Sequence, residues 1–209
     1  YLIEKKIKKI DLVGNTEIYA KPTNSIPEYT KINSQQSTAI FEQELQNATA
    51  NGNVYIETNK NGKLSKIRSQ NAVYDKPFDK FALKQEVEII TVEDNQPTVV
   101  RSNEAIYEQT AGKIYLNGGA NITQGSNFVK GDNIYAQLYP NKKLQYSESK
   151  GNAYLRQVTP ERTTEITGNE LNTTFGSNEH AQNAIAKGNA YLKQTSNERV
   201  SEVRGNELN

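Results

Sequence analysis

Apolar and polar residues alternate along most of this chain, and the alternation predicts β-strands. Val54 and Ile56 are two positions apart, and so are Val87 and Ile89, while Leu83 precedes Val87 by an even number of residues. Successive side chains of a strand point to opposite faces, so each strand is expected to have one apolar face. The pattern predicts an all-β protein.

One strand pattern recurs about every 33 residues. Its copies align on a Val or Ala at the fourth position, and neighbouring copies are 33, 33, 33 and 37 residues apart. A fixed period indicates a fold built by stacking similar units. The copies are NGNVYIET (51–58), KQEVEIIT (84–91), NGGANITQ (117–124), KGNAYLRQ (150–157) and KGNAYLKQ (187–194).

A second pattern alternates with the first, so each repeat predicts two strands. Two faces of this pattern are candidates for burial. One carries the Ala and Tyr of each copy, as in Ala72 and Tyr74 or Ala105 and Tyr107, and the other carries the residue between them. We favour burial of the Ala and Tyr face. The copies are TAIFE (38–42), NAVYD (71–75), EAIYE (104–108), DNIYA (132–136), GNELNT (168–173) and GNELN (205–209).

Stacked repeats would form two facing antiparallel sheets whose apolar sides look at each other. We expect the turns between strands at the Gly- and Asn-rich segments 59–62, 118–119 and 125–126. The repeats are compatible with a β-sandwich, a jelly roll or a solenoid, with unpaired edges near residues 2–13 and 202–209.

Composition narrows the class of protein. The 25 Lys and Arg balance 24 Asp and Glu, so charge gives no reason to expect nucleic acid as a partner. Only 34% of the residues are hydrophobic, which fits a thin β-structure with one polar face. The absence of cysteine excludes a disulfide framework and thiolate metal sites. The chain begins with tyrosine, as expected of a mature or trimmed chain.

Candidate catalytic groups are scarce. The only histidine, His180, lies in a polar stretch and is expected at the surface. Glu57, Glu88, Glu104 and Glu108 fall on the expected solvent face, where their pKa values have no reason to rise. We therefore predict no enzyme activity, no cofactor and no metal site.

The run YLNGGANITQGSNFVKGDNIYAQLYPNKKLQYSESKGNAYL (115–155) combines a Lys-Gly-Asp-x-Ile-Tyr strand, a polar turn and a Gly-Asn-Ala-Tyr-Leu strand. In this order it resembles the periplasmic lipopolysaccharide-transport family, which comprises LptA, LptC and the OstA-like domain of LptD. The resemblance extends through 35–209, whereas residues 1–34, with Pro22 and Pro27, do not align. It implies an open β-jellyroll, a folded-over V-shaped sheet whose apolar groove holds the acyl chains of lipopolysaccharide.

The resemblance also implies partners and a compartment. Copies or relatives would join head-to-tail by their edge strands into a periplasmic bridge between the inner and outer membranes, with a membrane anchor, if one exists, outside this chain. The ligand would be lipopolysaccharide or a related lipid. The candidate groove residues are Phe41, Val54, Ile56, Tyr74, Leu83, Val87, Ile89, Tyr107, Leu116, Ile122, Tyr135, Leu155 and Leu192.

Two other classes of protein remain open at this point. A structural or adhesive β-solenoid would have a closed core and no lipid. A carbohydrate-active enzyme on a repetitive β-scaffold would gather carboxylates on one face of adjacent strands, and the sequence shows no such cluster.

Overall fold

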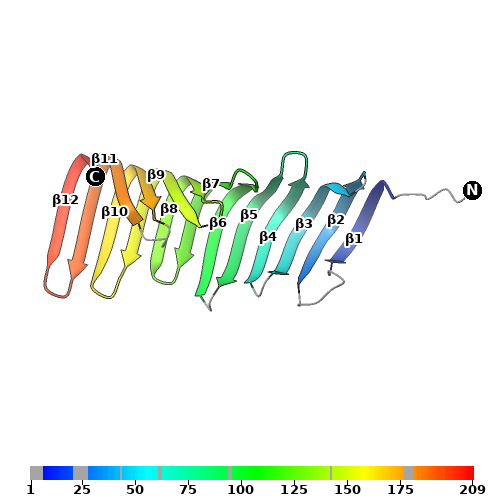
Figure 1. The fold of residues 1–209 in the computed structure, drawn as a ribbon, viewed down its shortest axis with the longest axis horizontal. Helices are drawn as coiled ribbons and strands as arrows, with labels where there is room; N and C mark the ends of the chain where they lie inside the picture. Colours follow the sequence, from blue (N-terminus) through cyan, green and yellow to red (C-terminus); the bar gives the residue numbers. More distant parts are fainter. Residues whose placement is uncertain are drawn as a thin grey trace, which may run out of the picture.

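The computed structural model describes residues 7–20, 28–42, 44–60, 63–93, 96–141, 143–176 and 181–209. Over these residues the chain forms one twelve-stranded sheet in which each strand pairs antiparallel with the next in sequence (Figure 1). The strands are β1 (Lys9–Ala20), β2 (Tyr29–Phe41), β3 (Leu45–Lys60), β4 (Lys63–Asp75), β5 (Lys80–Glu93), β6 (Gln96–Glu108), β7 (Lys113–Gln124), β8 (Asn127–Leu138), β9 (Leu144–Val158), β10 (Arg162–Phe175), β11 (Ala181–Ser196) and β12 (Val200–Leu208).

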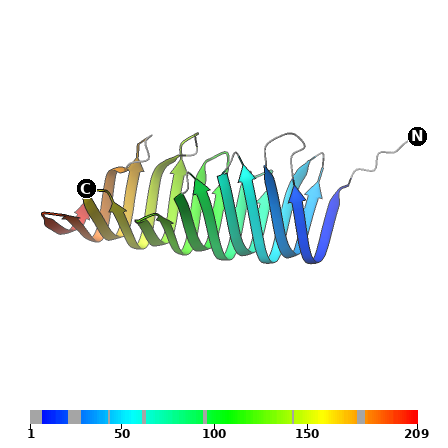
Figure 2. The ribbon, with the colours of Figure 1, turned by 90° about the horizontal axis from the view of Figure 1, so that it is seen from below.

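The sheet is folded along a line that crosses the strands near their middles. In Figure 2 the strands run to this line and turn back, so that two arms rise from it in a V. The predicted all-β, folded-over jellyroll is confirmed, and the two facing sheets are the two arms of one open sheet. We call the half that contains Ala50 and Leu83 arm A, and the half that contains Ile56 and Ile89 arm B.

A β-bulge in the odd-numbered strands produces the fold. At this line β3, β5, β7, β9 and β11 each have two consecutive residues with positive φ, and the strand register shifts there. A bulge bends its strand and increases the local twist. The consecutive residues are Gly52 and Asn53, Gln85 and Glu86, Gly118 and Gly119, Gly151 and Asn152, and Gly188 and Asn189.

The prediction that 118–119 forms a turn between strands is therefore wrong, because this pair bends β7 in its middle. The segment 125–126 does form the turn between β7 and β8, as predicted. Asn59 and Lys60 end β3, and residues 61–62 lie outside the described part of the chain. Glycine and asparagine serve both roles because both accept positive φ.

Burial follows the predicted alternation. Ala72 and Ala105 are buried, as are Val54 and Leu83 on odd-numbered strands, so the favoured face of the second pattern is the inner one at these alanines. Buried residues from both arms, with Ala50 among them, pack into one cluster that extends from β3 to β8. The outer face carries charged residues such as Glu88 and Arg101 together with apolar ones such as Ile90.

The two ends of the sheet are edge strands. In the described residues β1 pairs only with β2, and β12 pairs only with β11. The predicted C-terminal edge at 202–209 coincides with β12, and β1 overlaps the predicted N-terminal edge at residues 9–13. Pro22, Pro27 and His180 lie outside the described residues.

Candidate functional site

A row of aliphatic side chains crosses the whole sheet on the inner face of arm B. At one position of every strand there is an Ile, Val or Leu, and each is paired directly with its counterpart on the next strand. We call this row the aliphatic ladder. Its members are Ile18, Ile32, Ile56, Ile67, Ile89, Val100, Ile122, Val129, Leu155, Ile166, Leu192 and Val203.

The ladder forms a continuous apolar strip along the long axis of the sheet. Neighbouring strands are about 4.8 Å apart, so twelve strands extend the strip over roughly 50 Å. Ile56 is buried, whereas Ile89 and Ile122 are only half-buried, and Val203 on the last strand is 47% exposed. The strip therefore has apolar surface that its own sheet does not fully cover.

Arm A contributes a second row, which contains aromatic rings. Tyr74 pairs with Phe81, and Phe81 pairs with Tyr107, which in turn pairs with Ile114. Phe81 and Ile114 pack against the buried cluster. Tyr74 and Tyr107 are half-buried in the same row, so the inner face of arm A is apolar but bulkier than the ladder.

The structure brings most of the predicted groove residues together on the inner face. Ile89, Ile122, Leu155 and Leu192 belong to the ladder, as does the buried Ile56. The others are buried close to the bend or belong to the arm A row: Val54, Leu83, Val87, Leu116, Tyr74 and Tyr107.

Phe41 lies apart from these residues, at the rim of arm A. It ends β2 opposite Leu45, where the register shifts, and its amide N–H donates to the carbonyl of Lys8 at 2.8 Å. Its ring is half-buried, so Phe41 can contact the inner space only from its margin.

Tyr135 points away from the inner face. Its neighbours Ile134 and Ala136 are 2% and 6% exposed, so alternation directs Tyr135 to the outer face, where its ring lies 5.2 Å from that of Tyr115. The predicted inward orientation is wrong because the repeat that ends at β8 is shorter than 33 residues. The alignment of DNIYA with EAIYE on the tyrosine therefore placed Tyr135, instead of Ala136, at the inward position.

Sequence reasoning missed the ladder residues of the even-numbered strands. A signal existed, because each lies seven residues before an inner residue of the second pattern: Ile67 before Tyr74, Val100 before Tyr107, Val129 before Ala136 and Ile166 before Thr173. Seven is an odd number, so simple alternation assigns these residues to the wrong face. The even-numbered strands change face at the bend, because their buried residues there, Ser69 and Ala72 on β4 and Ser102 and Ala105 on β6, are three positions apart, and this change returns the ladder residues to the inner face.

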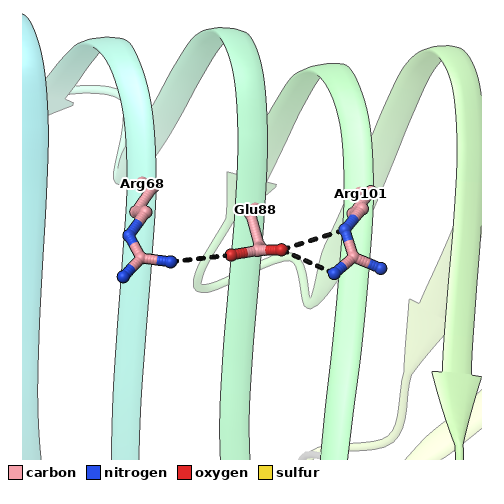
Figure 3. Close-up of polar contacts among 3 residues, drawn as sticks. All are labelled: Arg68, Glu88 and Arg101. Carbon is pink, nitrogen blue, oxygen red and sulfur yellow. Dashed lines mark hydrogen bonds and ion pairs between the residues drawn. The ribbon is translucent and has the colours of Figure 1, made fainter.

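The outer face beside the bend carries a network of charges. Glu88 accepts hydrogen bonds from Arg68 Nη1 at 3.1 Å and from Arg101 Nε and Nη2 at 2.9 and 2.7 Å, so one carboxylate joins β4, β5 and β6 (Figure 3). The hydrogen bonds from Arg101 hold the pKa of Glu88 below its ordinary value.

These residues line an open hollow of about 770 Å³. Its polar side chains bond to one another: Gln70 Nε2 donates to Glu86 Oε2 at 3.0 Å, and Gln70 Oε1 accepts from the amide of Asn53 at 3.3 Å. The guanidinium of Arg68 also lies over the ring of Tyr55. Because these polar groups already bond to one another, the network stabilises the bend and offers few free donors or acceptors to a ligand.

Replacing Glu88 with glutamine is expected to lower the free energy of unfolding at pH 7 by about 1 kcal/mol, because both arginines lose their ionic partner on a side chain that is 22% exposed. The pKa of Glu88 is lower in the folded protein than its ordinary value of 4.5. The ion pairs therefore stabilise the fold above pH 4.5, and this contribution is lost as the pH falls below it. Urea unfolding between pH 3 and 7 measures both effects.

The matched control is Glu161→Gln, at an exposed position in the turn before β10. It should leave the stability unchanged at pH 7. Equal losses for the two variants would show that the contacts of Glu88 do not stabilise the sheet.

Neither a metal site nor a membrane-spanning helix is found in the described ranges. No group of three or more His, Asp or Glu side chains there is placed to hold a metal ion. No helix in those ranges is long and apolar enough to cross a membrane.

Comparison with known proteins identifies the family. No curated protein is similar enough to match the chain. A family model described as lipopolysaccharide-assembly, LptC-related matches residues 27–154, more than half of the chain. The match covers strands β2 to β8 and most of β9, and with them the ladder from Ile32 to Val129. The chain belongs to the LptC-related family of lipopolysaccharide-assembly proteins.

Proposed function

We propose that the chain is a non-enzymatic carrier that holds the acyl chains of lipopolysaccharide, or of a related lipid, between the two arms of its sheet. The observation that carries this proposal is the aliphatic ladder, which continues over all twelve strands. Each methylene buried against it contributes about 0.8 kcal/mol, so several acyl chains bind without a specific polar contact. Similar apolar side chains at every step let a lipid move along the strip with small changes in free energy.

The half-buried ladder residues favour a carrier over a structural solenoid. A closed, dry core would cover the ladder, yet Ile67, Ile89, Val100 and Ile122 all keep accessible surface. A catalytic role has no support, because the carboxylate of Glu88 on the outer face is held by ion pairs with Arg68 and Arg101 rather than placed beside a second carboxylate for acid–base chemistry.

We also propose that the edge strands β1 and β12 join this chain to further copies or relatives in the periplasm. An edge strand keeps one row of unpaired N–H and C=O groups, which pairs with another strand. Because the two edges differ, the contact is head-to-tail and produces an open series of species. The ladder reaches both edges, at Ile18 and Val203, so joined chains would share one apolar strip.

Photo-crosslinking tests the lipid assignment. Crosslinkers at Ile89, Ile122 or Leu155 are expected to capture lipopolysaccharide, because these positions lie on the inner face of arm B. Crosslinkers at the outer positions Glu88 and Asn121, each next to a ladder residue, should not. Capture is measured by mass shift on gels of protein isolated from a lipopolysaccharide-containing host. Equal capture from both faces would overturn the proposal.

Proline substitutions in β12 test head-to-tail pairing. N–H groups point alternately to the two sides of a strand, so of Glu202 and Val203 one directs its N–H toward β11 and the other away. We expect both Glu202→Pro and Val203→Pro to shift the protein toward monomer in light scattering. Only the substitution at the inward N–H should also lower the stability. Lipid capture at Ile89 should persist in both.

The unmodified protein supplies the reference for this experiment. It should show a mass that rises with concentration. A strict monomer at high concentration would contradict the proposed association without affecting the lipid assignment.

A further inference from the structure

A second hollow, of about 470 Å³, opens on the outer face near the rim of arm A, over β8 to β11. Tyr135 and Tyr146 lie on the face opposite the buried Ile134 and Ser149, so this hollow is separate from the space between the arms. None of the eight lining side chains is charged: four are aromatic and four carry an amide or a hydroxyl group. They are Tyr135, Tyr139, Tyr146, Phe175, Gln137, Gln145, Gln182 and Thr174.

Two β-bulges place glutamines at this hollow. In β9 the register passes from Tyr146 to Leu144, which leaves Gln145 as the extra residue. In β11 it passes from Asn183 to Ala181, which leaves Gln182 in the same position. A bulge redirects the side chain of its extra residue. Both glutamines are exposed, and each amide offers donors and an acceptor to solvent.

The tyrosine rings are held in place by hydrogen bonds. Tyr135 Oη donates to Gln137 Oε1 at 2.9 Å, and Tyr146 Oη lies 2.8 Å from Asn172 Oδ1. Tyr139 Oη donates to the carbonyl of Phe175 at 3.1 Å. Burial and the carboxylates of Glu148 and Glu170 raise the pKa of Tyr146, so its phenol stays neutral. Rings that are already ordered cost little entropy when a ligand packs on them.

We propose that this hollow binds a neutral glycan. A sugar ring presents an apolar C–H face that packs on an aromatic ring, and hydroxyl groups that bond to amides, and the hollow supplies both kinds of partner. The uncharged lining gives a phosphate or carboxylate no ionic partner, and the amides make it a poor site for an acyl chain. Its volume lies within the range of small-molecule sites.

Two sources supply a sugar of this chemistry. One is the saccharide part of lipopolysaccharide, which would reach the rim while the acyl chains lie between the arms. This source rests on the proposed function. The other is a separate neutral oligosaccharide, which needs no lipid at all.

Saturation-transfer NMR on the intact chain tests the site, with a neutral, lipid-free oligosaccharide fraction released from lipopolysaccharide in one arm and maltoheptaose in the other. We expect saturation of the tyrosine rings to reach sugar ring protons in at least one arm, and the responding arm identifies the source. Replacing Tyr135 with leucine, or both Gln145 and Gln182 with alanine, should weaken binding about tenfold. Lipid capture at Ile122 should not change, which separates this site from the proposed function.

The chain offers a matched control in Gln46, the extra residue of the equivalent bulge in β3, which lies outside the hollow. Gln46→Ala should leave sugar binding unchanged, and circular dichroism checks that every variant folds. Absence of transfer in both arms overturns the proposal. Binding that survives both the Tyr135→Leu and the double glutamine variant also overturns it.

Discussion

Replacing Ile89 with aspartate is expected to abolish lipid capture and to lower the free energy of unfolding by about 3 kcal/mol or more. Ile89 is a ladder residue between Ile67 and Val100, and it packs against the buried cluster. A carboxylate there would have no ionic partner on the apolar inner face, and it would interrupt the strip along which acyl chains are proposed to lie. Urea unfolding measures the stability, and crosslinking at Ile122 measures capture.

Two control variants separate loss of binding from loss of fold. Ile90→Asp makes the same chemical change on the next residue, which faces outward opposite Lys66, and should preserve capture. Ile89→Val removes one methylene and should cost about 1 kcal/mol with capture retained. Capture that survives Ile89→Asp at a temperature where the variant is folded would contradict the role of the ladder.

Replacing Gly151 with valine should destabilise the fold by roughly 3 kcal/mol, through the bend. Gly151 has φ of +71°, where a β-branched residue is strained, and a Cβ there would lie 2.6 Å from Cγ and 2.8 Å from Cβ of Asp132. Rotation of the Asp132 side chain moves its Cγ but not its Cβ, so the backbone at the bend must shift to accept the valine. Urea unfolding measures the cost.

Gly119 provides the comparison, because it has φ of +70° but no atom within 4 Å of the position of an added Cβ. Gly119→Val should therefore cost only the backbone strain, about 1 to 2 kcal/mol. A loss at Gly151 no greater than that at Gly119 would show that contact with Asp132 does not limit the bend.

Much of the fold could be predicted from the sequence, because its causes are local. Alternation of apolar residues defines strands, and a 33-residue period of two strand patterns defines an antiparallel stack. The buried positions Val54, Leu83 and Ala105 followed from side-chain parity alone. The resemblance to lipopolysaccharide-transport proteins rested on the same repeated residues, and the family match agrees with it.

Parity failed where the backbone left the regular strand. In the even-numbered strands the buried residues on either side of the bend are three positions apart, so the face that carries an apolar residue on one side does not predict the face on the other. Ile67 and Val100 were missed for this reason, and Tyr135 was assigned to the wrong face because its repeat is shorter. Glycine pairs in turns and in bulges look alike in sequence, since both accept positive φ.

By itself, the sequence determined which segments become strands, which residues near the repeat anchors are buried, and that the strands stack in chain order. These outcomes follow from the repeat period, the alternation of apolar side chains and the strand propensity of each segment, all of which can be read along the chain. Only the tertiary structure decided that one sheet folds along the bulges of the odd-numbered strands, that twelve aliphatic residues align into a ladder, and that Tyr135, Tyr146 and Gln182 meet at an outer hollow. Those outcomes depend on strand register, which hydrogen bonds set between residues distant in the chain.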